Sequence, residues 1–241
     1  MSTLAITNAF AYVDSHDFTG DSNQFSLTCE ADPQDKTTFR SGGWREYNLG
    51  VKTSQLSLGG FYQAWADSVD EYSFNALGVT GRVTTCGTVE VEGEPAGMFQ
   101  SMAHQYQILG QHGENAPFSL QGGCSDGVGV IRGRLAKETG TVSAPGAIGT
   151  ALNLGAVSST QYLYATIHLL GTAGTTITVV VESDDANTFA SAITRMTLGP
   201  YTTVGGRWAT RVAGPITDTW WRMRVTSVTG TWTVAGAIGI Q

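Results

Sequence analysis

Residues 162–182 read YLYATIHLLGTAGTTITVVVE, and this stretch decides the fold class of the chain. Both of its halves are rich in β-branched and aromatic residues, and the turn Gly171-Thr172-Ala173-Gly174 separates them, which predicts two neighbouring strands. Runs of the same kind recur at a spacing of roughly ten residues, at 192–198, 209–212, 220–225 and 232–240. This rhythm predicts a β-sandwich of jelly-roll or immunoglobulin-like type and leaves no room for βαβ units.

The first half of the chain also has the pattern of short strands separated by turns. Strand-like runs precede and follow a polar turn near Asp17 and Gly20, and further runs follow from Trp44 onward. One helix is expected, over residues 67–78, with Ser68 as its N-cap and Gly78 at its end. The sequence therefore predicts an all-β protein with a single short helix.

Charge and composition change together near residue 140. Residues 1–139 hold 16 acidic and 8 basic side chains, whereas residues 140–241 hold 4 and 5. The segment KETGTVSAPGAIG, residues 137–149, is small, polar and glycine-bearing, as linkers are. We expect a domain at 1–137, a linker at 138–149 and a second domain at 150–241. The first domain is expected to fold and assemble without residues 145–241.

The acidic first half argues against nucleic-acid binding, because such a surface repels phosphates. It suits a channel that DNA passes without sticking. The chain has no basic, apolar N-terminal leader and no apolar run of 18 residues, so we expect a chain made and folded in the cytoplasm, without contact with a membrane.

Residues that could carry chemistry are scattered. The four histidines (His16, His104, His112 and His168) fit no metal-binding or triad pattern, and the three cysteines (Cys29, Cys86 and Cys124) read as buried thiols. His16 with Asp14, Asp17 and Asp21 could bind calcium, but a solvated hairpin tip explains the same residues. We expect no catalytic residues, no metal and no cofactor.

Four tryptophans gather in the second half, at 208, 220, 221 and 232. Strand alternation in WWRMRV places Trp221 in the core and Trp220 on the outer face. Aromatic platforms can stack on sugar rings, so Trp208 and Trp220 are candidates for a binding surface on the outside, although a core-plus-surface role explains them as well.

A long polar stretch, PQDKTTFRSGG at residues 33–43, has no sustained periodicity. It is too long for a tight turn and predicts a projecting arm. Segments of this kind usually carry contacts.

The stretch DKTTFRSGGWREYNLGVKTSQLSLGG, residues 35–60, resembles the signature region of major tail (tail tube) proteins of long-tailed, siphovirus-type bacteriophages. The matching elements are Thr37-Thr38-Phe39 with Ser41, the aromatic and charged Trp44-Arg45-Glu46, Gly50-Val51-Lys52, and the strand that ends in Gly59-Gly60-Phe61. Val51 departs from the commoner leucine. The resemblance covers about residues 4–137 and includes the short helix. The second half resembles the β-sandwich domains that decorate some phage tail proteins.

The resemblance implies a β-barrel or sandwich in the first domain and a structural role in the virion tail, after assembly in the host cytoplasm. Six such domains would form a ring, and stacked rings would form a channel for DNA delivery without specific DNA binding. Implied partners are further copies and the tape measure, terminator and distal tail proteins. The implied contact loop between subunits and rings contains Pro33, Asp35, Lys36, Thr37, Thr38, Phe39, Arg40, Trp44 and Arg45.

Other classes of function stay open at this point. The second domain could be a module that binds host glycans or a receptor through Trp208 and Trp220. The chain could also be a capsid decoration or head–tail connector protein. An enzyme is the least favoured class, because no nucleophile, base and orienting group can be assembled from the sequence.

Overall fold

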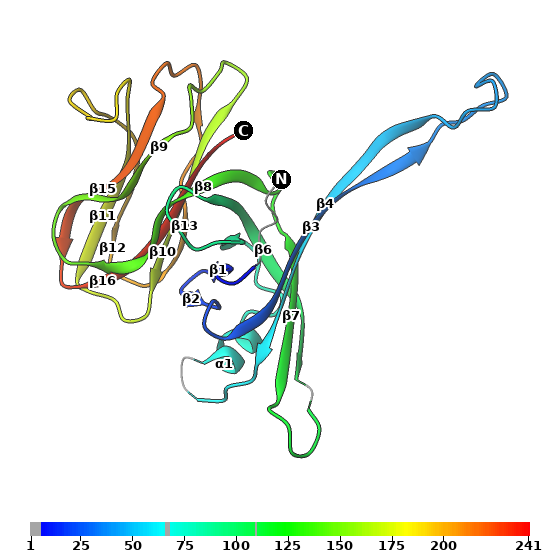
Figure 1. Cartoon of the computed structure of the whole chain (residues 1–241), viewed down its shortest axis with the longest axis horizontal. Coiled ribbons are helices and arrows are strands. Elements are labelled where there is room, and N and C mark those ends of the chain that lie inside the picture. Colours follow the sequence, from blue (N-terminus) through cyan, green and yellow to red (C-terminus); the bar gives the residue numbers. More distant parts are fainter. Residues whose placement is uncertain (1–5, 66–67, 109) are drawn as a thin grey trace. The chain divides into compact units, whose positions relative to one another are not determined.

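The computed structural model describes residues 6–65, 68–108 and 110–241, and this part of the chain is almost entirely β-structure with one short helix (Figure 1). The all-β prediction is confirmed. The elements in chain order are β1 Phe10–Val13, β2 His16–Asp17, β3 Ser22–Asp35, β4 Tyr47–Phe61, α1 Val69–Asn75, β5 Arg82–Gly87, β6 Pro95–Ile108, β7 Pro117–Cys124, β8 Ile131–Val142, β9 Gly146–Asn153, β10 Tyr162–Leu170, β11 Thr176–Asp184, β12 Ile193–Tyr201, β13 Gly205–Trp208, β14 Val212–Ala213, β15 Trp220–Thr229 and β16 Trp232–Ile240.

The chain folds into two compact units. Unit 1 comprises Met1–Asp21, Gly81–Gln100 and Ile131–Gln241, and unit 2 comprises Ser22–Thr80 and Ser101–Val130. Strand β6 contributes its first half to unit 1 and its second half to unit 2. The division is therefore discontinuous in sequence, unlike the two consecutive domains that the sequence predicts.

Unit 1 contains the β-sandwich expected from the second half of the chain. One sheet has the order β12-β11-β15-β9, and the facing sheet includes β13-β10-β16-β8. Alternate residues of β10, among them Leu163 and Ile167, are buried in the core between the sheets together with Val179 of β11 and Trp221 of β15. The prediction that Trp221 is a core residue is confirmed, and Trp232 is equally buried.

The second sheet of unit 1 continues from β8 through β6 and β5 to β1 and β2. It curls so that β5 and β1 cover the other face of β10. There the buried His168 ring contacts the backbone carbonyl of Asp14 at 2.9 Å and the Thr85 hydroxyl at 2.8 Å. The first strands of the chain thus pack directly on the C-terminal half.

Most of residues 138–149, where the sequence predicts a linker, lie in strands. β8 continues to Val142 and pairs with β16 along most of its length, and β9 begins at Gly146. One glycine in this segment, Gly149, serves close packing instead of flexibility. Gly149 has a φ of +70°, and a Cβ atom at this position would collide with the carbonyl oxygen of Ala136. Small residues therefore mark a close backbone contact that composition cannot distinguish from a linker.

Unit 2 is a sheet of β3, β4, β7 and the second half of β6, with α1 beside it. The helix is shorter than predicted, and residue 67 lies outside the described residues. Ser68 occupies the N-cap position as predicted, but its hydroxyl donates to the carbonyl of Gln63 and makes no capping hydrogen bond. Gly78 follows the helix with a φ of +75°, and its N–H donates to the carbonyl of Ala103 in β6. The described strands close no barrel.

Candidate assembly interface

The β3–β4 hairpin extends beyond the rest of unit 2 as a two-stranded arm (Figure 1). Strand β7 pairs with β4 only from Gln55 to Phe61, so the segments 30–35 and 47–54 pair only with each other. At the rise of a strand, this free portion is about 20 Å long before its tip. We define the arm as residues 30–54 and its tip as Lys36–Glu46.

Polar contacts within the hairpin hold the tip. Asp35 accepts a hydrogen bond from the N–H of Thr37 at 2.8 Å. Hydrogen bonds from the side chain and then the backbone of Thr37 lower the pKa of the Asp35 carboxyl group. The Thr37 hydroxyl accepts from the N–H of Glu46 at 3.0 Å, which ties the two sides of the tip together. A turn from Thr38 to Ser41 follows, with the N–H of Ser41 bonded to the carbonyl of Thr38. The conformation is therefore fixed locally, without support from other elements.

A β-bulge bends the arm at Gly50, where the register shifts between the pairs Ala31–Lys52 and Pro33–Leu49. A Cβ atom on Gly50 would collide with the carbonyl oxygen of Asp32 on the opposite strand. This contact is the physical reason for glycine in the Gly50-Val51-Lys52 segment.

Large apolar side chains are exposed mostly on unit 2. Of the 14 exposed large hydrophobic residues in the described chain, 11 belong to unit 2. Five lie on the arm: Phe39, Trp44, Tyr47, Leu49 and Val51. Six lie elsewhere in the unit: Phe61, Trp65, Phe74, Leu77, Val79 and Ile108. Concentrations of this kind mark interaction surfaces.

The sheet of unit 2 has two chemically different faces. Cross-strand partners share a face, so the register places Phe25 with Leu58 and Leu120, and Ser26 with Ser57 and Gln121. The first face is apolar and mostly buried. The second face is exposed or half-buried and carries Gln24, Ser26, Thr28, Gln55, Ser57, Gln105, Gln107, Ser119 and Gln121.

Outside the arm, the described residues of this second face, which we call the polar face, include no Lys, Arg, Asp or Glu. The Gln55 amide donates to the side-chain oxygen of Gln121 at 3.3 Å, which confirms that the two side chains lie on the same face. Helix α1 lies against the apolar face, where the Tyr106 hydroxyl donates to Asp70 at 2.9 Å.

Strand β3 is an edge of this sheet. Among the described residues it pairs only with β4, so its outer backbone groups over 14 residues have no sheet partner. A long edge strand is a liability in a monomer and a joining surface in an oligomer.

All residues of the predicted contact loop lie on the arm. Pro33 and Asp35 are in β3, and the remaining predicted residues are on the tip. The sequence predicts an irregular stretch from residue 33, whereas the strand continues to Asp35. Leu49 and Val51, which are exposed on the same arm, were missed because the sequence places them in an ordinary half-buried strand.

The two tryptophans of the candidate binding surface belong to different sheets. Trp208 ends β13, with its ring 6.0 Å from that of Tyr164, and Trp220 begins β15. Both are half-buried. They therefore do not form one shared aromatic platform.

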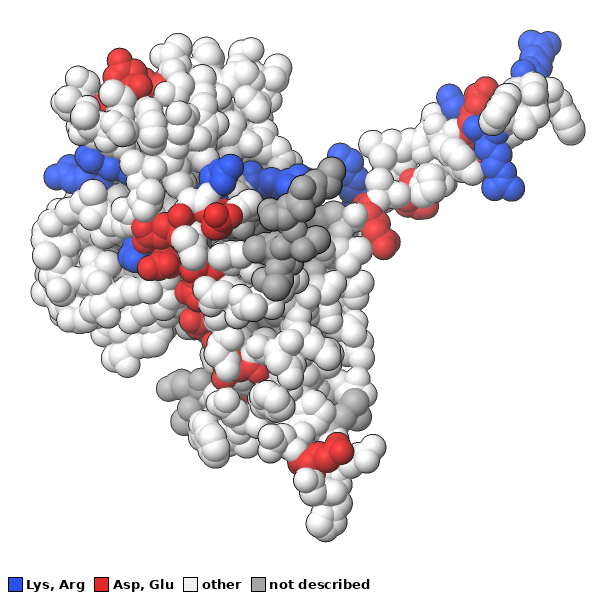
Figure 2. All heavy atoms as spheres, viewed as in Figure 1, with Lys and Arg blue, Asp and Glu red and all other residues white. Residues whose placement is uncertain are grey.

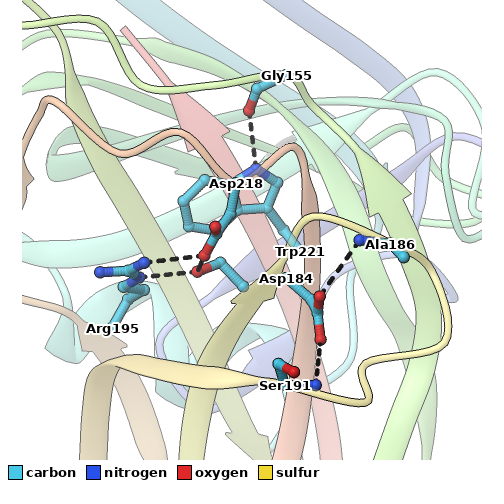
Figure 3. Close-up of polar contacts among 8 residues, drawn as sticks. Gly155, Asp184, Ala186, Ser191, Arg195, Asp218 and Trp221 are labelled. Carbon is cyan, nitrogen blue, oxygen red and sulfur yellow. Dashed lines mark hydrogen bonds and ion pairs between the residues drawn. The ribbon is translucent and has the colours of Figure 1, made fainter.

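The end of the sandwich next to Trp220 is held by buried and half-buried polar contacts (Figure 3). The Trp221 indole donates to the carbonyl of Gly155 at 2.9 Å. Asp218 accepts from the Ser183 hydroxyl at 2.6 Å and from Arg195 at 2.8 Å, and both contacts lower the pKa of its carboxyl group. Asp184 accepts from the N–H of Ser191, which lowers its pKa and closes the following loop. These carboxylates are engaged in holding loops.

The acidic hairpin near His16 is likewise engaged by protein partners. Asp14 binds Arg82 at 2.8 Å, Asp17 accepts from the N–H of Thr19, and His16 contacts Asp21 at 3.1 Å. No group of three or more His, Cys, Asp or Glu residues in the described ranges could hold a metal ion. Cys86 is buried as expected, whereas Cys29 is exposed on β3, contrary to the prediction of buried thiols.

In the described part of the chain, no helix has the length and apolar character needed to cross a membrane.

Comparisons with known proteins found matches among solved structures. No family model matches the chain. No curated protein matches it either. Among solved structures, the chain is similar to one in the virion of a native gene transfer agent particle, with 18% identity and a TM-score of 0.41, over 51% of this chain and 95% of that chain.

A second similar chain is in the tail of an empty gene transfer agent particle with C6 symmetry (17% identity, TM-score 0.39, 47% of this chain and 90% of that chain). A third is the SPP1 Dit protein, described as a hub adsorption apparatus in phages that infect Gram-positive bacteria (11% identity, TM-score 0.37, 97% and 99%). At these scores the likenesses do not decide the function of this chain.

Proposed function

We propose that this chain is a structural virion protein, the tube subunit of a long phage tail, which polymerises through unit 2 into stacked rings around a DNA channel. The signature of residues 35–60 supports this proposal, and the two-faced sheet of unit 2 carries it.

The polar face has the chemistry that a DNA channel requires. Lysine and arginine would hold the phosphate backbone and slow its passage. The polar face presents hydroxyl and amide groups without charge, so it can be hydrated without binding DNA. The overall charge of the first half suggested an acidic channel, whereas the proposed channel surface is uncharged. The apolar face behind it is mostly buried within unit 2.

The free edge of β3 supplies a means of closing a ring. Strand pairing between copies would satisfy its backbone groups and make the polar faces of neighbouring subunits continuous. Sixfold symmetry is the ring size implied by the resemblance. In this arrangement the sandwich of unit 1 contributes no residue to the channel and decorates the tube.

Negative-stain electron microscopy of the purified chain tests the proposal. The wild-type chain should form rings or tubes, and a variant with Asn-Gly in place of Lys36–Glu46 should remain folded but fail to form tubes. The turn connects Asp35 directly to its cross-strand neighbour Tyr47, so the remaining hairpin keeps its register. Normal tubes from the deletion variant, or neither rings nor tubes from the wild type, would contradict the proposal.

The other classes of function have their own tests. Glycan-array binding that is lost in Trp208→Ala or Trp220→Ala would favour the receptor-binding class. Antibody labelling of the capsid instead of the tail would favour a decoration protein.

A further inference from the structure

The two ends of unit 2 carry complementary chemistry. Strand β4 runs from Tyr47 on the arm to Phe61 at the opposite end of unit 2, where Phe61 pairs with Pro117 of β7. Helix α1 and the loop between β6 and β7 lie at this second end (Figure 1). We define the α1 surface by its exposed side chains, which are Phe61, Trp65, Glu71, Phe74, Leu77, Val79, Ile108 and Glu114.

We propose that the tip of the arm of one copy docks on the α1 surface of a second copy in the next ring. The inference rests on the proposed function and names the partner surface of the arm.

Charge separates the two ends. All four Lys and Arg residues of unit 2 lie on the arm (Lys36, Arg40, Arg45 and Lys52), and the tip has a net charge of +2 (Figure 2). The sequence has no Lys or Arg over residues 53–81 or 83–131, whereas the α1 surface carries the acidic Glu71 and Glu114. Complementary charge steers encounter and fixes the register of a contact.

Each end also carries aromatic side chains that its own unit does not cover. On the tip, Phe39 is fully exposed and Trp44 is 81% exposed. On the α1 surface, Trp65 is 72% exposed and Phe74 is 67% exposed. Aromatic and arginine side chains dominate the binding energy of protein interfaces. Burial of each aromatic group against the other would remove both apolar patches from water.

The position of the two surfaces excludes self-docking within unit 2, because the arm points away from α1. A contact between different surfaces of two copies is heterologous, and it repeats without closing when the copies stack along an axis. The same contact can therefore propagate from ring to ring, while the edge of β3 remains available within each ring.

Charge reversal tests the docking directly. We expect Arg40→Glu with Arg45→Glu to raise the critical concentration for tube assembly about tenfold at low salt. Glu71→Lys with Glu114→Lys should do the same. Combining all four substitutions in one chain restores opposite charges on the two surfaces. This quadruple variant should therefore assemble at a critical concentration near that of the wild type. All four positions are exposed, so the fold should be retained.

Disulfide trapping provides a second measurement that does not need tubes. Arg40→Cys and Glu71→Cys are placed in separate chains that also carry Cys29→Ser, because Cys29 is exposed. Mixed oxidation should give a disulfide-linked heterodimer. A matched control uses Gln107→Cys, an exposed position on the polar face, in place of Glu71→Cys, and should give little product.

The outcomes separate the two proposals. Tubes that assemble equally well with either charge reversal, together with no preferred trapping at Glu71, would overturn the docking and leave the tube function intact. A specific disulfide between the Arg40→Cys and Glu71→Cys chains, in a protein that never forms tubes or rings, would support the docking and overturn the tube function.

Discussion

Acid should destabilise this protein through His168, which lies where the first strands of the chain pack on the C-terminal half. A carbonyl cannot donate, so Nδ1–H of His168 donates to Asp14, and Nε2 accepts from Thr85. Complete burial lowers the pKa of His168 to about 4, from 6.5. A protonated ring would lose its acceptor role and carry an unpaired charge in the core.

The sign of the effect follows from proton binding. The unfolded chain binds a proton at this histidine near its ordinary pKa, and the folded chain does so only in stronger acid. The contribution of His168 to stability is fully present above pH 6.5 and is lost as the pH falls towards 4. The two pKa values correspond to a loss of about 2 kcal/mol at pH 5 and roughly 3 kcal/mol well below pH 4.

Urea unfolding at pH 7.5 and pH 5.0, below the assembly concentration, measures this loss. His168→Gln should be less stable than wild type at pH 7.5, but its free energy of unfolding should fall about 2 kcal/mol less between the two pH values. Replacing the exposed His104 by glutamine is the control and should leave the wild-type pH dependence unchanged. If wild type and His168→Gln lose the same free energy on acidification, the buried neutral histidine is not the cause.

Two further predictions concern the core of unit 1. Removal of residues 146–241 should give an insoluble or unfolded product, because β8 loses its partner β16 and β5 loses the cover of β10; a soluble, folded fragment by circular dichroism would contradict this packing. Trp221→Phe should cost about 2 kcal/mol through a lost hydrogen bond and a small cavity, whereas Trp220→Phe should cost under about 1 kcal/mol; equal losses in thermal unfolding would refute the assignment of core and outer face.

Strands with strong local signals could be predicted from the sequence. The runs predicted at 162–170 and 232–240 coincide with β10 and β16, since β-branched and aromatic residues there face a buried core on at least one side. The unit division could not be predicted in this way. It depends on the pairing of β8 with β16, whose residues are far apart in sequence, and on a glycine whose role at Gly149 is close approach.

The candidate interface was predictable only in part. A polar stretch with unusual length indicated the arm, and the signature indicated its role. The polar face was hidden because alternation of Ser, Thr and Gln with apolar residues in β3 and β4 looks like any sheet with one solvated side. The lack of charged residues on the polar face can be recognised only once the register shows that β7 and β6 lie beside those strands.

The uneven exposure of apolar residues supports the proposal that the chain assembles through unit 2 and not through the sandwich. Unit 1 closes its core between two sheets, and Arg222 and Arg224 pair with its buried Glu182. Among its described residues, unit 2 leaves 11 large apolar side chains exposed and one strand edge without a partner, and its tip has a net charge of +2. A monomer gains no stability from such surfaces, whereas two different ends that fit one another allow repeated growth. Disrupting either end of unit 2 should therefore stop polymerisation without unfolding the chain, while disrupting unit 1 should unfold it.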